Sequence, residues 1–127
     1  MKSLLLALTC LLLSAAAAHA APAISANNVS AFCAAGFAIN TTNMASSSRK
    51  MACIAYLDAV IATTAQIEAL ANSRDKRSIF CLPKSAGYDQ LAKQFVNFLR
   101  KNKDYGDRAG AALVIAAFAD KYPCKKG

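Results

Sequence analysis

Cysteine is the residue type in this chain whose spacing says most about possible chemistry. Four cysteines follow residue 20, and His19 is the only histidine, so no histidine is left to complete a zinc site. The gaps between these cysteines are long and none forms a Cys-x-x-Cys pair, which favours two disulfide bonds. Paired cysteines offer no thiolate nucleophile. The four are Cys33, Cys53, Cys81 and Cys124.

Carboxylates give no better basis for catalysis. Asp58 and Glu68 are ten residues apart, which on a helix is about 15 Å, whereas a glycosidase pair needs about 5 to 10 Å. The chain also has no phosphate-binding loop and no Gly-x-Ser-x-Gly elbow. The sequence therefore predicts a protein that is not an enzyme, with no cofactor and no metal.

The first 20 residues have the pattern of a cleavable signal peptide. Lys2 is followed by an apolar run, Leu4 to Leu13, and by the small-x-small site Ala18-His19-Ala20. This run is too short to span a bilayer, and no later segment is expected to do so. We therefore expect export to the periplasm, with residues 1–20 as signal peptide and residues 21–127 as a single domain.

The chain is strongly basic. Its net charge is +8, and removal of Lys2 with the leader leaves 14 Lys and Arg against 7 Asp and Glu, about +7. Such a surface suits an acidic protein or an anionic envelope polymer, and export argues against nucleic acid. The cations occur in short groups: Arg49-Lys50, Arg74-Lys76-Arg77, Arg100-Lys101-Lys103 and Lys125-Lys126.

Helical periodicity places Cys33 and Cys53 on the first two predicted helices. A first helix is predicted from apolar residues at i, i+3, i+4, i+7 and i+8, with Asn27 or Asn28 as its cap. A second helix is predicted from about Ser48 to Ala71. The first stripe is Val29, Phe32, Cys33, Gly36 and Phe37, and the second is Cys53, Tyr56, Leu57, Val60, Ile61, Thr64, Ile67 and Leu70.

Two further helices follow the Leu82-Pro83 turn. The third has Tyr88, Leu91, Ala92, Phe95, Phe98 and Leu99 on one face and Asp89, Lys93, Asn97, Arg100 and Lys101 on the solvent face. The fourth is expected to be capped by Asp104 and to be buried on all sides from Ala109 to Ala119. The fold class is therefore all-α, a small four-helix (or four- to five-helix) bundle stapled by disulfides.

Helix connections favour one disulfide pairing without excluding another. A short link makes the third and fourth helices antiparallel, which brings Cys81 close to Cys124, and the same reasoning pairs Cys33 with Cys53. The alternative, Cys53 with Cys81 and Cys33 with Cys124, stays open because the loop after Ala71 could return along the second helix.

With the cysteines placed, the chain resembles the Rap/Tai family of immunity proteins, which protect bacteria against peptidoglycan amidase effectors of type VI secretion. Departures from the family pattern are Ala55 and Ala59, where the family has glycine. The matching motifs are Cys33, Cys53-Ile-Ala-Tyr56 through Val60, Phe80-Cys81-Leu82-Pro83, Gln90-Leu91 leading to Phe98-Leu99, and Ala111 to Val114 through Tyr122-Pro123-Cys124.

The resemblance implies an inhibitor that blocks the cleft of an amidase in the periplasm, commonly as a homodimer with a protruding loop. Exposure and charge alone point to Arg74, Asp75, Lys76 and Arg77 as contact residues, with Arg49 and Lys50 as second choice; an ordinary solvated loop is the alternative. A small acid-stress chaperone of the periplasm and a basic envelope-binding protein remain alternative functions.

Overall fold

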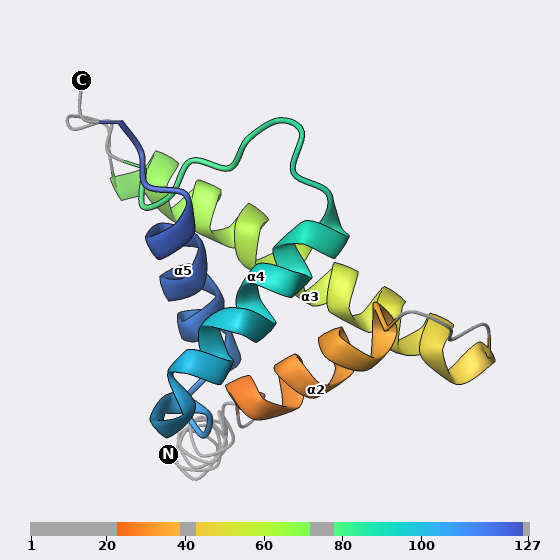
Figure 1. Cartoon of the computed structure of the whole chain (residues 1–127). Helices are drawn as coiled ribbons and strands as arrows, with labels where there is room; N and C mark the ends of the chain where they lie inside the picture. Colours follow the sequence, from red (N-terminus) through yellow and green to blue (C-terminus); the bar gives the residue numbers. More distant parts are fainter. Residues whose placement is uncertain (1–22, 39–42, 72–77, 126–127) are drawn as a thin grey trace, which may run out of the picture.

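The computed structural model describes residues 23–38, 43–71 and 78–125, and all four predicted helices lie in these ranges. They are α2 (Ala26–Gly36), α3 (Met44–Ala71), α4 (Tyr88–Lys101) and α5 (Gly110–Lys121), with a 3-10 helix, η2 (Lys103–Tyr105), between the last two. The 28-residue α3 lies behind the other three helices and extends past them (Figure 1). The predicted all-α fold is confirmed.

The start of α2 is fixed by the segment before α5. The N–H of Ala26 donates to the carbonyl of Arg108 at 2.8 Å, and the N–H of Gly110 donates to the carbonyl of Ile24 at 2.8 Å. Ser25 caps α2, so Asn27 and Asn28 were the wrong residues. Asp104 does not cap α5 either, because residues 103–109 turn through η2 to make these hydrogen bonds.

Helix α3 begins earlier and is buried over a shorter length than its pattern predicts. The side chain of Asn43 accepts a hydrogen bond from the N–H of Ser46 at 2.8 Å, which starts the helix at Met44 instead of about Ser48. The core stripe ends at Thr64, since Ile67 is 58% exposed and Leu70 is 85% exposed. The last two turns of α3 therefore pass beyond the core.

The core lies where the four helices meet. Its largest fully buried side chains come from all four of them: Val29, Leu57, Phe95, Val114 and Phe118. Helix α5 is not buried on all sides as expected, because Ala112 and Ala116 are exposed. Ala112 and Ala116 are apolar but small, and they form an outward face, while the larger side chains Leu113, Val114 and Phe118 point inward.

Both disulfides have the pairing that helix topology favours. Cys33 bonds Cys53, and Cys81 bonds Cys124, with sequence separations of 20 and 43 residues. Loop closure of these lengths stabilises the folded state by about 3 and about 4 kcal/mol, mainly by restricting the unfolded chain. The first bond joins α2 to α3, and the second joins the segment before α4 to the end of α5.

Helix α3 also affects the question of membrane spans. By length and composition it could cross a membrane, since an 18-residue window within it has a mean hydropathy of 1.3. The expectation that no segment after residue 20 is long and apolar enough to span a membrane was wrong, because many alanines raise the mean hydropathy of α3 without a run of large side chains. A core helix of a soluble domain passes the same test, so one such helix is weak evidence for a span. Only 22% of the apolar 18-residue segment of α3 is buried, so it is less covered than the core helix of a soluble domain usually is.

Candidate partner-binding site

The structure reports on two of the six residues proposed as partner contacts. Arg74, Asp75, Lys76 and Arg77 lie outside the described residues, so their placement is untested. Arg49 and Lys50 are both exposed near the start of α3. The Lys50 ammonium lies over the ring of Phe37, 5.2 Å from its centroid, an arrangement that stabilises a cation through the negative face of the ring.

The position of Lys50 depends on close packing between α2 and α3. A Cβ atom on Gly36 would lie 2.5 Å from the Lys50 amide nitrogen, so the two helix backbones touch at this point and only glycine fits. The Cys33–Cys53 bond, one turn away on both helices, fixes the same contact. These features hold Phe37 and Lys50 together at one end of α2.

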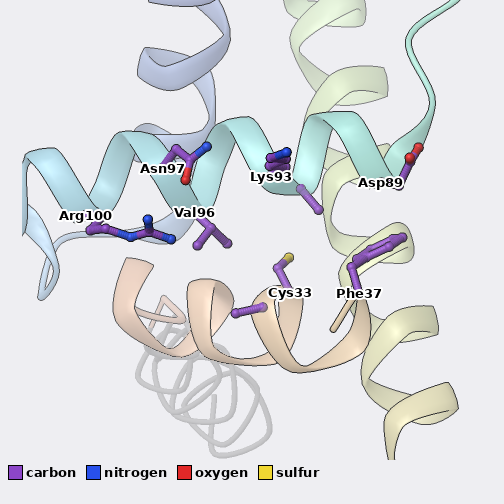
Figure 2. Close-up of a pocket in the computed structure, with 9 residues that line it drawn as sticks. Cys33, Phe37, Asp89, Lys93, Val96, Asn97 and Arg100 are labelled. Carbon is purple, nitrogen blue, oxygen red and sulfur yellow. The ribbon is translucent and has the colours of Figure 1, made fainter. Parts of the chain in front are cut away.

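A groove runs between α2 and α4 beside this corner, and we call it the α2–α4 groove. It has a volume of about 500 Å³. Apolar atoms from both helices and polar groups from α4 line it (Figure 2). The apolar lining includes Ala34, Phe37, Ala92 and Val96, and the polar lining is Asp89, Lys93, Asn97 and Arg100.

Charge in the α2–α4 groove is mostly positive. Lys93 and Arg100 line it together with a single carboxylate, Asp89, and Lys50 borders it through Phe37. In Figure 2 the Arg100 side chain extends along the groove toward Val96. An apolar floor with cations at its edge suits a protein segment that carries both an apolar and an acidic side chain, because the floor removes water from the ion pairs.

A hydrogen bond from its first residue connects α4 to α3. The Tyr88 hydroxyl donates to Asp58 of α3 at 2.5 Å, and this bond, with burial and the negative charge of Asp58, raises the pKa of Tyr88 above 10.0. Partial burial also raises the pKa of Tyr56 on α3. A hydrogen bond from the backbone of Ala111 opposes this increase but is the smaller of the two effects, so the net pKa is raised. Both tyrosines are neutral at physiological pH and act in packing.

Within the described ranges, no group of three or more histidine, cysteine or acidic residues could hold a metal ion. The groove has one carboxylate and two cations, and this set supplies a binding surface instead of a general base paired with a nucleophile.

Sequence reasoning identified the polar face of α4 but treated it as ordinary solvent surface. Asp89, Lys93 and Asn97 recur every four residues, with Arg100 three residues later, so they form one ridge along the helix. The small residues Ala34 and Ala92 leave space between this ridge and α2. The polar ridge together with these small residues was the sequence feature that could have indicated the groove. Recognising it required knowing that α2 and α4 are in contact.

The fold and the groove together define a small helical binding protein held by two disulfides. A family model, Rap1a immunity proteins, matches residues 15–124, and the chain belongs to this family. The resemblance to immunity proteins is thereby confirmed, as is the prediction that the protein is not an enzyme. The family and the disulfides indicate a location outside the cytoplasm. Comparison with curated proteins and with solved structures gives no significant match.

Proposed function

We propose that this protein binds a peptidoglycan amidase effector of type VI secretion in the periplasm and occludes its active-site cleft. The signal peptide, residues 1–20, would direct export and then be removed. Membership of the Rap1a immunity protein family supports a cognate effector as the partner. That this effector is a peptidoglycan amidase is implied by the resemblance of the chain to the Rap/Tai family.

The observation that carries the proposal is the α2–α4 groove with its positive edge. Lys93 and Arg100 lie about two turns apart on α4 and face an apolar floor, so a carboxylate of the partner could bond to either one. The basic charge of the whole chain would also speed encounter with an acidic effector surface. The groove is therefore our candidate for effector contact.

Residues 74–77, which follow α3 in the sequence, are a second proposed contact. Arg74, Lys76 and Arg77 add three cations close together in sequence, and Asp75 lies among them. Replacing the three cations with serine should weaken binding of an acidic effector and leave thermal stability nearly unchanged, because exposed charges contribute little to stability.

The experiment starts from tagged residues 21–127 with both disulfides formed. Effectors captured from secreted and periplasmic extract at 0.15 M and 0.5 M salt are identified, and the captured amidase is then assayed on peptidoglycan with increasing amounts of the protein. Stoichiometric inhibition that survives 0.5 M salt supports the proposal. Capture of many proteins only at low salt would instead favour an envelope-binding protein.

The groove is tested with charge reversals. Lys93→Glu with Arg100→Glu should raise the Kd for the amidase at least about 30-fold, which corresponds to about 2 kcal/mol for lost ion pairs at a desolvated contact. The control, Lys84→Glu with Lys103→Glu, makes the same charge change at exposed positions outside the groove. Equal effects of the two variants would mean that only net charge matters.

An acid-stress chaperone is distinguished by its response to pH. Such a protein unfolds or dissociates when its carboxylates are protonated. Circular dichroism at pH 2 to 3 that still shows the folded spectrum would argue against it.

We further propose that the protein acts as a homodimer, as the family resemblance implies.

A further inference from the structure

The two disulfides of this protein differ in how easily a reagent in solution can reach them. Cys33 and Cys53 lie on helices α2 and α3, and both are 0% exposed. Cys81 is exposed and Cys124 is half-buried, and neither lies in a helix. Because exchange with a thiol requires access to a sulfur atom, the folded protein shields the Cys33–Cys53 bond and leaves the Cys81–Cys124 bond accessible. We call them the inner disulfide and the outer disulfide.

The backbone on both sides of the outer disulfide lies outside regular secondary structure. Residues 78–87 form neither helix nor strand and run as an arc from the end of α5 to the start of α4 (Figure 1). Residues 122–125, which follow α5, are not helical either. Segments of this kind adapt to a protein that binds against them more readily than packed helices do. The outer disulfide is therefore a suitable substrate for another protein, and the inner one is not.

The sequence beside Cys124 is mostly positive. Lys121 lies three residues before this cysteine and Lys125 directly follows it, and both lysines are exposed. Asp120 is the only carboxylate within four residues of either cysteine of the outer disulfide. A nearby ammonium group stabilises a thiolate, and a more stable thiolate leaves a disulfide faster. Attack on the more exposed Cys81 would release Cys124 as the thiolate, next to these lysines in the sequence.

We propose that the outer disulfide is a thiol–disulfide exchange site for a dithiol oxidoreductase that shares the compartment of this protein outside the cytoplasm. The thiolate of the oxidoreductase attacks Cys81, forms a mixed disulfide with it and releases Cys124 as a thiolate. The second thiol of the oxidoreductase then attacks the mixed disulfide and releases Cys81. The oxidoreductase loses two electrons and becomes a disulfide, while its two electrons and the thiol protons pass to Cys81 and Cys124. The reverse reaction, with an oxidised partner, forms the bond.

Exchange at the outer disulfide would loosen the end of α5 and leave the bundle folded. The inner disulfide and the core stay in place, because neither includes residues 122–125. Two contacts keep the reduced cysteines near each other, so that the bond can form again. The N–H of Cys81 donates to the carbonyl of Tyr122 at 2.8 Å, and the ring of Phe80 packs edge-on against Phe118 with 5.6 Å between centroids.

A buried hydroxyl at the same end of α5 favours opening. The hydroxyl oxygen of Tyr122 is buried and has no hydrogen-bond partner among the residues that the structure describes. A buried hydroxyl without a partner has lost the hydrogen bonds that it makes in water, which destabilises the closed state. Loosening of residues 122–125 would let this hydroxyl reach water. The outer disulfide therefore holds closed an end of the protein that would otherwise open more readily.

The consequence of exchange would be a shorter-lived protein. The two cysteines of the outer disulfide are 43 residues apart, and releasing a loop of that length raises the unfolding equilibrium constant by up to about 10³-fold. The reduced form would open far more often, and proteases cleave the opened state. The α2–α4 groove is lined by Cys33 of the inner disulfide, so binding in the groove should not require the outer one.

Partial reduction of residues 21–127 tests the exposure argument. The folded protein is treated with dithiothreitol, free thiols are blocked at intervals with N-ethylmaleimide, and the blocked cysteines are identified by mass spectrometry. The outer disulfide should be reduced at least about 100-fold faster than the inner one, which opens only when the core unfolds. The product, blocked at Cys81 and Cys124 alone, should keep its helical circular dichroism. In guanidinium chloride both disulfides should be reduced at similar rates.

A trapping experiment tests the partner. A Cys-x-x-Cys oxidoreductase whose second cysteine is replaced with alanine cannot complete the exchange, so it should be captured as a mixed disulfide with Cys81. Lys125→Glu should slow this capture about threefold or more because it removes a cation beside the leaving thiolate. Lys103→Glu, the same change at an exposed position in η2, is the control and should have no effect.

Tyr122→Phe tests the role of the buried hydroxyl. It should lower the fraction of outer disulfide that is reduced at equilibrium with dithiothreitol by about fivefold or more, because the closed state no longer holds an unpaired hydroxyl. Equal reduction rates of the two disulfides in the folded protein, loss of the helical spectrum when only the outer one is reduced, or no mixed disulfide at Cys81 would each overturn the proposal. None of these measurements involves the amidase, so they do not depend on the proposed function.

Discussion

Replacing Gly36 with alanine should destabilise the protein, although alanine normally favours a helix. The added Cβ would lie 2.5 Å from the Lys50 nitrogen and 2.6 Å from its Cα, both of which are backbone atoms that cannot rotate away. An ordinary contact is at least 3.4 Å, so α2 and α3 would have to separate by about 0.9 Å, the difference between 3.4 Å and 2.5 Å. The Cys33–Cys53 bond one turn away opposes this movement.

Overpacking of this kind costs about 1 to 3 kcal/mol, and the better helix propensity of alanine returns up to about 1 kcal/mol. We expect a net loss of about 1 to 2 kcal/mol, which lowers the Tm by about 5 to 15 °C in a domain of this size. The assay is urea and thermal unfolding of residues 21–127 followed by circular dichroism. Ala31→Gly, at an exposed position in the middle of α2, measures the propensity term alone. A Gly36→Ala variant as stable as the wild type, or more stable, would show that the two backbones do not approach so closely.

Two further outcomes follow from burial and from hydrogen bonding. Leu57→Ala should lower the free energy of unfolding by about 2 to 5 kcal/mol because Leu57 is fully buried, whereas Leu70→Ala, at an 85% exposed position, should change it by about 0.5 kcal/mol or less. Equal losses in urea unfolding would contradict the observed end of the core. The raised pKa of Tyr88 means that the folded state holds this proton more tightly than the unfolded state, so stability is fully present below pH 10 and declines as pH rises through the raised value. Melting curves from pH 8 to 11.5 should show this decline, and Tyr88→Phe should make it shallower; an unchanged slope would mean that the tyrosine contributes nothing.

The number of helices and their inward faces could be predicted from the sequence because both depend on local periodicity. The face of α4 that carries Leu91, Phe95 and Leu99 is an example, since each of these residues repeats at helical spacing and is buried. The assumption that a short link makes two helices antiparallel favoured the observed disulfide pairing, but the alternative pairing was excluded only by the structure.

Features that depend on distant contacts could not be predicted. Asn27 looks like a helix cap, but the segment around Gly106 and Arg108 bonds to the start of α2 and leaves Ser25 as the cap. Ile67 continues a regular stripe and yet is 58% exposed, because exposure depends on which neighbouring side chains cover a position and periodicity does not report that. The α2–α4 groove required the same knowledge of which helices are neighbours.

The two disulfides make the stability of this protein depend on the compartment it occupies. Together they contribute about 7 kcal/mol by restricting the unfolded chain, whereas a typical domain has a total stability of only about 5 to 15 kcal/mol. In the reducing cytoplasm neither bond persists, so the newly made chain would be marginally folded there and easy to thread through an export channel. Under the proposed export, oxidation outside the cytoplasm would complete the fold where the effector is to be bound, and the reduced protein would have little capacity to hold a partner in the cytoplasm.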